Sequence, residues 1–116
     1  MSRPRLAKPP KVYESSVVSA CIEWLYKRGC FVWRNNTGAY KPENSSAYVR
    51  YGYKGSADIL GITPKGGRLV AIECKGTGGK VSDAQLEFGL KINRLGGIYI
   101  VAYSVDDLEK RRDELV

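Results

Sequence analysis

Histidine is absent from the 116 residues of this chain. It is the general base of Ser-His-Asp and Cys-His enzymes, and it supplies essential groups in HNH nucleases and H-E-x-x-H metalloproteases. None of these mechanisms is open to the chain. Any catalysis must therefore rely on carboxylates, lysine, tyrosine or a bound metal ion.

Cysteines are few, and long apolar runs are missing. Cys21, Cys30 and Cys74 are odd in number and lack C-x-x-C spacing, which argues against a zinc knuckle or a disulfide framework. No segment approaches the roughly 20 apolar residues of a membrane span, and residues 1–11 lack the apolar core of a secretory signal. We therefore expect a cytoplasmic protein in a reducing compartment, without a membrane partner.

Positive charge is in excess. Lys and Arg number 19 against 12 Asp and Glu, which gives a net charge of +7 and a pI near 9.4. Such a balance is typical of nucleic-acid binders, although solubility or attraction to an anionic membrane would also explain it. The length predicts one domain. We expect a flexible basic arm over residues 1–11 and a folded domain over residues 12–116.

The pattern of apolar residues predicts an α/β fold in the order α-β-β-β-α-β-α. The predicted helices are 13–28, 82–95 and one from Ser104 to the C-terminus, and the predicted strands are 30–34, 57–63, 68–75 and 98–103. Ser82 and Gln85 form a capping box at the start of the second helix. The nearly continuous apolar strands indicate a sheet covered by helices on both faces, with a parallel crossover into 98–103.

The sequence predicts a long irregular segment over residues 35–57, in which tyrosines alternate with basic residues. Aromatic rings suit stacking on bases, and Lys and Arg suit phosphate contacts. A β-strand excursion whose tyrosines pack on the body is an equally good interpretation, and the two are compatible. The candidate DNA-contacting residues here and in the glycine-rich loop at 76–80 are Tyr40, Lys41, Tyr48, Arg50, Lys54 and Lys80.

Two acidic residues are predicted to meet at one end of a β-hairpin. If Pro64 to Gly67 form its turn, then paired residue numbers sum to 131 and Asp58 lies opposite Glu73. Like charges placed directly across a hairpin are destabilising, so a cation should lie between them. Lys75 projects from the same face as Glu73. Two carboxylates and an ammonium at a strand end predict a divalent-metal site, with the lysine beside the attacking water.

Glu14 adds a third carboxylate on the inward-facing stripe of the first helix. By itself it is better explained as a first-turn glutamate that the helix dipole favours. A structural charge cluster remains the alternative to a metal site. The metal site is favoured because unpaired charge is costly at the end of buried strands.

The ordered motifs of the chain resemble the VRR-NUC family, the virus-type replication-repair branch of the PD-(D/E)xK nucleases. They are Gly55-Ser56-Ala57-Asp58-Ile59, Ala71-Ile72-Glu73-Cys74-Lys75, Gly79-Lys80-Val81-Ser82-x-x-Gln85 and Gly96-Gly97-Ile98. The resemblance covers nearly all of residues 13–115. One departure is Ala57, where the family usually has proline, a position that shapes the backbone and supplies no ligand.

The resemblance implies a restriction-endonuclease-like core that hydrolyses DNA with Mg2+ or Mn2+. Asp58 and Glu73 would be the main metal ligands, assisted by the backbone carbonyl of Cys74, and Glu14 a further ligand. Lys75 would orient or activate the attacking water, and Gln85 would support the site. Short stand-alone members, typical of phages and bacteria, resemble Holliday-junction resolvases and act as homodimers on branched DNA in replication, recombination or repair.

Other nuclease and binding functions remain as alternatives to be weighed. Gly97-Ile98-Tyr99 spells the first half of the GIY-YIG signature, but no YIG follows and the string reads as a buried strand. A sequence-specific restriction enzyme of the same superfamily is a further alternative; we expect no extra recognition domain, which favours recognition of DNA shape over base sequence, and a comparison of DNA substrates would decide. A non-catalytic DNA-binding or assembly protein that keeps the fold is the main alternative, and the set of three carboxylates and Lys75 argues against it.

Overall fold

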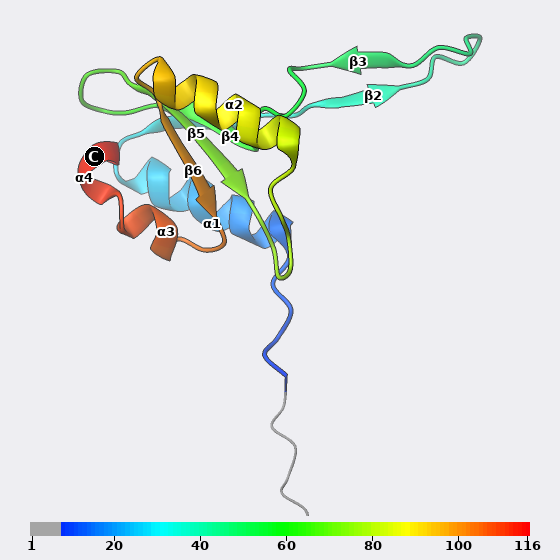
Figure 1. Cartoon of the computed structure of the whole chain (residues 1–116). Helices are drawn as coiled ribbons and strands as arrows, with labels where there is room; N and C mark the ends of the chain where they lie inside the picture. The colour runs from blue at the N-terminus through cyan, green and yellow to red at the C-terminus, as the bar shows by residue number, and fades with distance from the viewer. Residues whose placement is uncertain (1–7) are drawn as a thin grey trace, which may run out of the picture.

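The computed structural model describes residues 8–116 of the chain. The predicted basic arm falls mainly on residues 1–7, which lie outside the described residues. Residues 8–11 are exposed and form neither helix nor strand, and they extend away from the body (Figure 1).

Residues 8–116 form four helices and six strands. The helices are α1 (Glu14–Lys27), α2 (Asp83–Arg94), α3 (Asp106–Glu109) and α4 (Arg112–Leu115). The strands are β1 (Phe31–Arg34), β2 (Gly38–Tyr40), β3 (Val49–Tyr51), β4 (Ile59–Ile62), β5 (Leu69–Cys74) and β6 (Ile98–Ala102). The predicted α/β class and the bounds of the first two helices are confirmed to within about one residue.

A four-stranded mixed sheet in the order β1-β4-β5-β6 forms the centre of the molecule. The β4–β5 hairpin has the predicted register, from Ile59 opposite Ile72 to Ile62 opposite Leu69. β1 runs antiparallel to β4, and β6 runs parallel to β5 as predicted. This register brings the start of β4 and the end of β5 to the same edge of the sheet.

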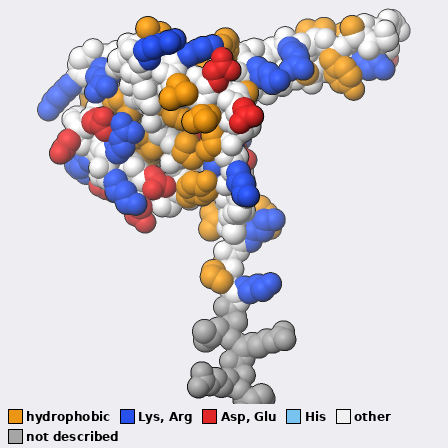
Figure 2. Space-filling view, viewed as in Figure 1, with side chains coloured by type: hydrophobic (Ala, Val, Ile, Leu, Met, Phe, Trp, Pro, Cys, Tyr) orange, Lys and Arg blue, Asp and Glu red, His pale blue; other side chains and the backbone are white. Residues whose placement is uncertain are grey.

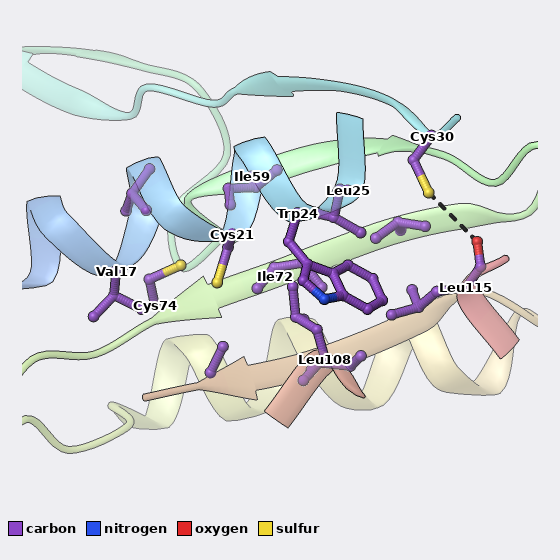
Figure 3. Close-up of a cluster of buried hydrophobic side chains, with 14 of the residues drawn as sticks. Val17, Cys21, Trp24, Leu25, Cys30, Ile59, Ile72, Cys74, Leu108 and Leu115 are labelled. Atoms are coloured by element: carbon purple, nitrogen blue, oxygen red, sulfur yellow. Dashed lines mark hydrogen bonds between the residues drawn. The ribbon is translucent and has the colours of Figure 1, made fainter. Parts of the chain in front are cut away.

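Helices cover both faces of the sheet, as the apolar strands predicted (Figure 1). The larger core lies between the sheet and α1, with the two C-terminal helices beside it (Figure 3). Its residues include Cys21, Leu25, Ile59, Ile72 and Cys74, all fully buried. A smaller cluster under α2 comprises Ala57, Ala71 and Tyr99, with Leu60, Phe88, Ile92 and Val101 packed against it.

The capping box at the start of α2 forms as predicted. Ser82 accepts a hydrogen bond from the backbone N–H of Gln85, and the side chain of Gln85 accepts one from the backbone N–H of Ser82. Two otherwise unpaired helix donors are thereby satisfied, so the first turn of α2 is fixed.

The single C-terminal helix predicted from Ser104 is wrong, because the segment forms the two short helices α3 and α4. At the break, the guanidinium of Arg111 donates a hydrogen bond to the backbone carbonyl of Tyr99 and pairs with Glu114. The backbone of Arg111 itself leaves helical geometry here, with φ −118° and ψ 22°. Ser104 and Asp107 still accept hydrogen bonds from backbone N–H groups, of Asp106 and Tyr103 respectively.

Residues 35–57 contain the β-strand excursion that one interpretation predicted, because β2 and β3 pair into an antiparallel hairpin. The hairpin projects from the body beside the N-terminal end of α2 (Figure 1). Tyr40, Tyr48 and Tyr51 are about half exposed or more, so the interpretation that the tyrosines pack on the body is wrong for these three. Among residues 8–116, no helix is long and apolar enough to span a membrane.

The C-terminal helices contribute to the core, and their contribution is measurable. Leu115 is fully buried and its carbonyl accepts a hydrogen bond from the thiol of Cys30 (Figure 3). We expect Leu115→Ala to lower the free energy of unfolding by about 2–5 kcal/mol. Leu90→Ala is the control, because Leu90 is 62% exposed and its loss should change stability by less than about 0.5 kcal/mol. Urea denaturation followed by circular dichroism measures both, and equal midpoints would contradict the prediction.

Candidate metal and active site

Three carboxylates meet at the edge of the sheet where β4 begins and β5 ends. One carboxylate oxygen from each of Glu14, Asp58 and Glu73 lies within 4.8 Å of the other two. Asp58 and Glu73 alternate with Ile59, Ile72 and Cys74, which face α1, so both carboxylates project toward α2. Glu14 comes from the first turn of α1, which covers the other face of the sheet.

Gln85 connects the buried charges of the site. Its amide nitrogen donates to Glu73 Oε1 at 2.8 Å, and its amide oxygen accepts from Lys75 Nζ at 2.9 Å. The same oxygen accepts a hydrogen bond from the backbone N–H of Ser82. The amide oxygen thus has two donors as partners and the amide nitrogen has a carboxylate, which fixes the orientation of the amide group. Lys75 Nζ also lies 3.5 Å from Glu73 Oε1.

Glu73 is the most deeply buried carboxylate of the site. It is 1% exposed, and its second oxygen, Oε2, has no hydrogen-bond partner among the described residues. Burial, reinforced by the negative charge of Asp58, raises the pKa of Glu73 to about 8. A buried carboxylate oxygen without a partner is costly, which favours a cationic ligand at this point.

The end of β5 presents alternate residues to the two faces of the sheet. The backbone N–H of Cys74 donates a hydrogen bond to Asp58 Oδ2 at 2.8 Å, which orients that carboxylate. The Cys74 side chain points instead into the core against α1 (Figure 3). Its backbone therefore belongs to the site while its thiol does not.

Glycine 76 permits the close approach that positions Glu14. A Cβ at this position would lie 2.6 Å from the Val12 carbonyl oxygen and 2.8 Å from the Glu14 nitrogen. Just beyond it, Thr77 and Val12 exchange two hydrogen bonds, Thr77 N–H to Val12 O at 2.9 Å and Val12 N–H to Thr77 Oγ1 at 2.8 Å. The sequence predicted only a flexible basic loop here, so this contribution of Gly76 and Thr77 was missed.

Tyr99 is a second residue near the site whose position the sequence did not predict. Its ring packs on Gly89 of α2, where a Cβ would lie 2.4 Å from the ring carbons. The buried hydroxyl has no hydrogen-bond partner among the described residues. Burial, together with the charges of Glu73 and Asp58, raises the pKa of Tyr99 to about 12. The hydroxyl is therefore neutral at physiological pH and lies in the field of the carboxylates.

The candidate DNA-contacting residues do not gather at the carboxylates. Tyr40, Lys41, Tyr48 and Arg50 lie on or within the β2–β3 hairpin, Lys54 follows it, and Lys80 lies in the loop before α2; all six are exposed. Lys and Arg side chains also line the visible face of this hairpin (Figure 2). The structure thus places five predicted site residues in one cluster and four of the six predicted DNA contacts on the projecting hairpin.

The family model of the VRR-NUC domain matches residues 13–106 of the chain. The chain belongs to the VRR-NUC family. No curated protein and no solved structure is similar enough to count as a match. The matched range contains every element from α1 to β6 and all the predicted site residues, which confirms the family predicted from the sequence.

Membership identifies the chain as a nuclease of the PD-(D/E)xK type, with DNA as the expected class of substrate. The VRR-NUC signature residues correspond to the geometry described above: an aspartate at the start of β4 and E-x-K across the end of β5. Ala57, where the family usually has proline, is fully buried in the cluster under α2. The individual catalytic and ligand roles of the site residues stay predictions.

The raised pKa of Glu73 predicts a pH dependence of stability. An unfolded glutamate has a pKa near 4.5, against about 8 in the folded protein. Between these values the folded state binds more protons than the unfolded state, so the free energy of unfolding falls as pH rises. We expect the Tm of the metal-free protein to drop from pH 5 to pH 8.5, and to drop less in Glu73→Gln.

Glu43→Gln is the control in this comparison, because Glu43 is exposed and the variant keeps the buried carboxyl of Glu73. Calorimetry in EDTA measures the three proteins across the pH range. An identical dependence of Tm on pH in wild type and Glu73→Gln would contradict the raised pKa of Glu73.

Proposed function

We propose that this VRR-NUC chain is a metal-dependent, structure-selective DNA endonuclease. The observation that carries the proposal is the convergence of three carboxylates within 4.8 Å beside the buried ammonium of Lys75. A charge cluster that served only stability would need each buried oxygen paired, and Glu73 Oε2 has no partner among residues 8–116.

The donor set fits a hard divalent cation. Its ligand atoms are carboxylate oxygens from Glu14, Asp58 and Glu73, which Mg2+ and Mn2+ prefer over soft or imidazole-binding metals. The Cys74 backbone adjoins this set, since its N–H bonds Asp58, and its carbonyl is a proposed fourth donor. When bound, such an ion supplies positive charge beside the scissile phosphate and makes a nearby water easier to deprotonate.

Lys75 and Gln85 are proposed to act together. Lys75 is 8% exposed, so its ammonium is only weakly screened by solvent and can stabilise charge that develops on the phosphate. Gln85 accepts a hydrogen bond from Lys75 Nζ at 2.9 Å and donates one to Glu73 Oε1 at 2.8 Å. These two bonds fix the distance between Lys75 and Glu73, the proposed metal ligand. Lys75 thereby orients the attacking water without any histidine.

The surrounding surface supports a DNA substrate of irregular shape. The net charge of +7 favours phosphate binding, with affinity that falls as salt rises. Exposed tyrosines and basic residues on the projecting hairpin suit stacking and phosphate contacts outside a straight duplex. We propose branched DNA, such as a four-way junction, as the substrate in replication, recombination or repair.

Cleavage assays test the proposed activity directly. A four-way junction, a fork, a linear duplex and single-stranded DNA are incubated with Mg2+, Mn2+ or EDTA. We expect metal-dependent cutting that prefers branched DNA, and a loss of about 100-fold or more in Asp58→Asn and in Lys75→Met. Asp113→Asn, an exposed carboxylate on α4, is the matched control and should cut normally.

Each alternative gives a different pattern in this assay. Tight junction binding without cutting in any metal would favour the non-catalytic DNA-binding function. Cutting at one base sequence regardless of DNA shape would favour a restriction enzyme. Full activity in EDTA would refute the metal site.

A homodimer is proposed because one small domain offers little surface for a four-way junction, whereas a two-fold dimer places two sites on it. We expect sedimentation equilibrium at micromolar concentration to give about twice the 12.9 kDa chain mass. The projecting hairpin is the proposed contributor, so deletion of residues 39–50 should shift the mass toward the monomer. A wild-type monomer under these conditions would contradict the prediction.

A further inference from the structure

A hollow lies between the residues that follow the projecting hairpin and the first turns of α2. Its volume is about 350 Å3, within the range of small-ligand pockets. It is lined by Tyr53, Lys54, Asp83, Ala84, Glu87 and Phe88. None of these residues bonds the carboxylates described above.

The walls of this hollow are held in place. At Gly55 the chain is pressed against α2 so closely that a Cβ would lie 2.4 Å from the Ala84 carbonyl oxygen, and its φ of +83° also requires glycine. Lys91 Nζ donates to the hydroxyl of Tyr53 at 3.1 Å and lies 5.8 Å from the centre of its ring. Tyr53 is therefore anchored although 58% of it is exposed.

The lining combines aromatic rings with hydrogen-bond acceptors. The rings of Tyr53 and Phe88 lie 6.0 Å apart at 45°, and rings of this kind stack on nucleobases. Asp83 and Glu87 supply carboxylate oxygens to the lining, where Glu87 also pairs with Lys91 at 3.3 Å and Lys54 adds a cation. Carboxylates do accept hydrogen bonds from the amino groups of bases, as in recognition of the cytosine amino group.

Residues that line the hollow are close in sequence to residues of the carboxylate site. Tyr53 and Lys54 line one side of it, and after three further residues the chain reaches Asp58, whose backbone carbonyl accepts a hydrogen bond from Asn35 N–H at 2.7 Å. On the other wall, Ala84 precedes Gln85, which bonds Glu73 and Lys75. A base held here would therefore fix the position of its own phosphodiester backbone relative to the site.

We propose that this hollow, hereafter the base pocket, binds an unpaired nucleobase of the DNA substrate. The inference rests on the proposed nuclease function and deepens it, because an unpaired base is available at branches and bulges and is stacked away in a regular duplex. Its acceptors favour bases with amino groups, so cytosine, adenine and guanine should bind better than thymine, which has none.

The test uses DNA hairpins that carry 2-aminopurine, an adenine analogue whose fluorescence is quenched by stacking, either as a single bulged base or paired in the stem. Titrations in EDTA prevent cleavage. We expect the full-length protein to change the fluorescence of the bulged base and not of the paired base. In Tyr53→Leu the bulged DNA should bind about 5-fold or more weakly, whereas Tyr53→Trp should retain binding.

Tyr26→Leu is the matched control, because Tyr26 is a 73% exposed tyrosine on α1 outside the pocket, and it should not change the signal of the bulged base. Competition by unlabelled hairpins should rank bulged cytosine above bulged thymine, and Glu87→Ala should reduce that ranking. Melting temperatures of the variants equal to wild type show that the fold is intact.

Two results would overturn the proposal: equal signals from bulged and paired 2-aminopurine, or equal binding by wild type and Tyr53→Leu. Because the titration needs no metal, its outcome is independent of cleavage. Metal-dependent cutting without a bulge-specific signal would refute the base pocket and support the proposed nuclease activity. A bulge-specific signal without cutting in any metal would support the base pocket and refute the proposed nuclease activity.

Discussion

The organisation of the site depends on the side chain of Gln85. Glu73 and Lys75 are 1% and 8% exposed, and charges buried to this degree are destabilising unless they are paired and hydrogen-bonded. One amide group contacts both, and its oxygen also completes the cap of α2. The start of the helix and the charges at the end of the strand are thus stabilised by the same few hydrogen bonds.

This arrangement separates two electrostatic tasks within a small chain. The net charge of +7 attracts DNA from a distance, within the screening length of the medium. The carboxylates at the sheet edge form a local region of opposite sign. A raised pKa of Glu73 limits the repulsion between them when no cation is present, because a protonated carboxyl carries no charge.

Much of this organisation could be predicted from the sequence because it is local. The turn at 64–67 set the register of β4 and β5, and that register placed Asp58 beside the end of β5. The S-x-x-Q spacing predicted the start of α2 and hence the position of Gln85. Each of these inferences uses residues within about twenty positions of one another.

Features that depend on contacts between distant segments were not predicted. The two short C-terminal helices replace one long helix at Arg111, whose side chain bonds the distant carbonyl of Tyr99 on β6. Gly76 resembles any loop glycine until α1 is placed against it. The hairpin of β2 and β3 was ambiguous for another reason: three-residue strands give too short a pattern to separate a strand from a loop.

The proposed ligands come from both layers of the fold, Asp58 and Glu73 facing α2 and Glu14 carried by α1 on the opposite side. The spacing between these oxygens is therefore set by the thickness and alignment of the core between sheet and helix. A substitution at a fully buried position such as Cys21 or Leu25 would shift α1 without touching the site. Under the proposed function, such a substitution lowers metal affinity while the protein is still folded, so that metal affinity reports on the packing of the core.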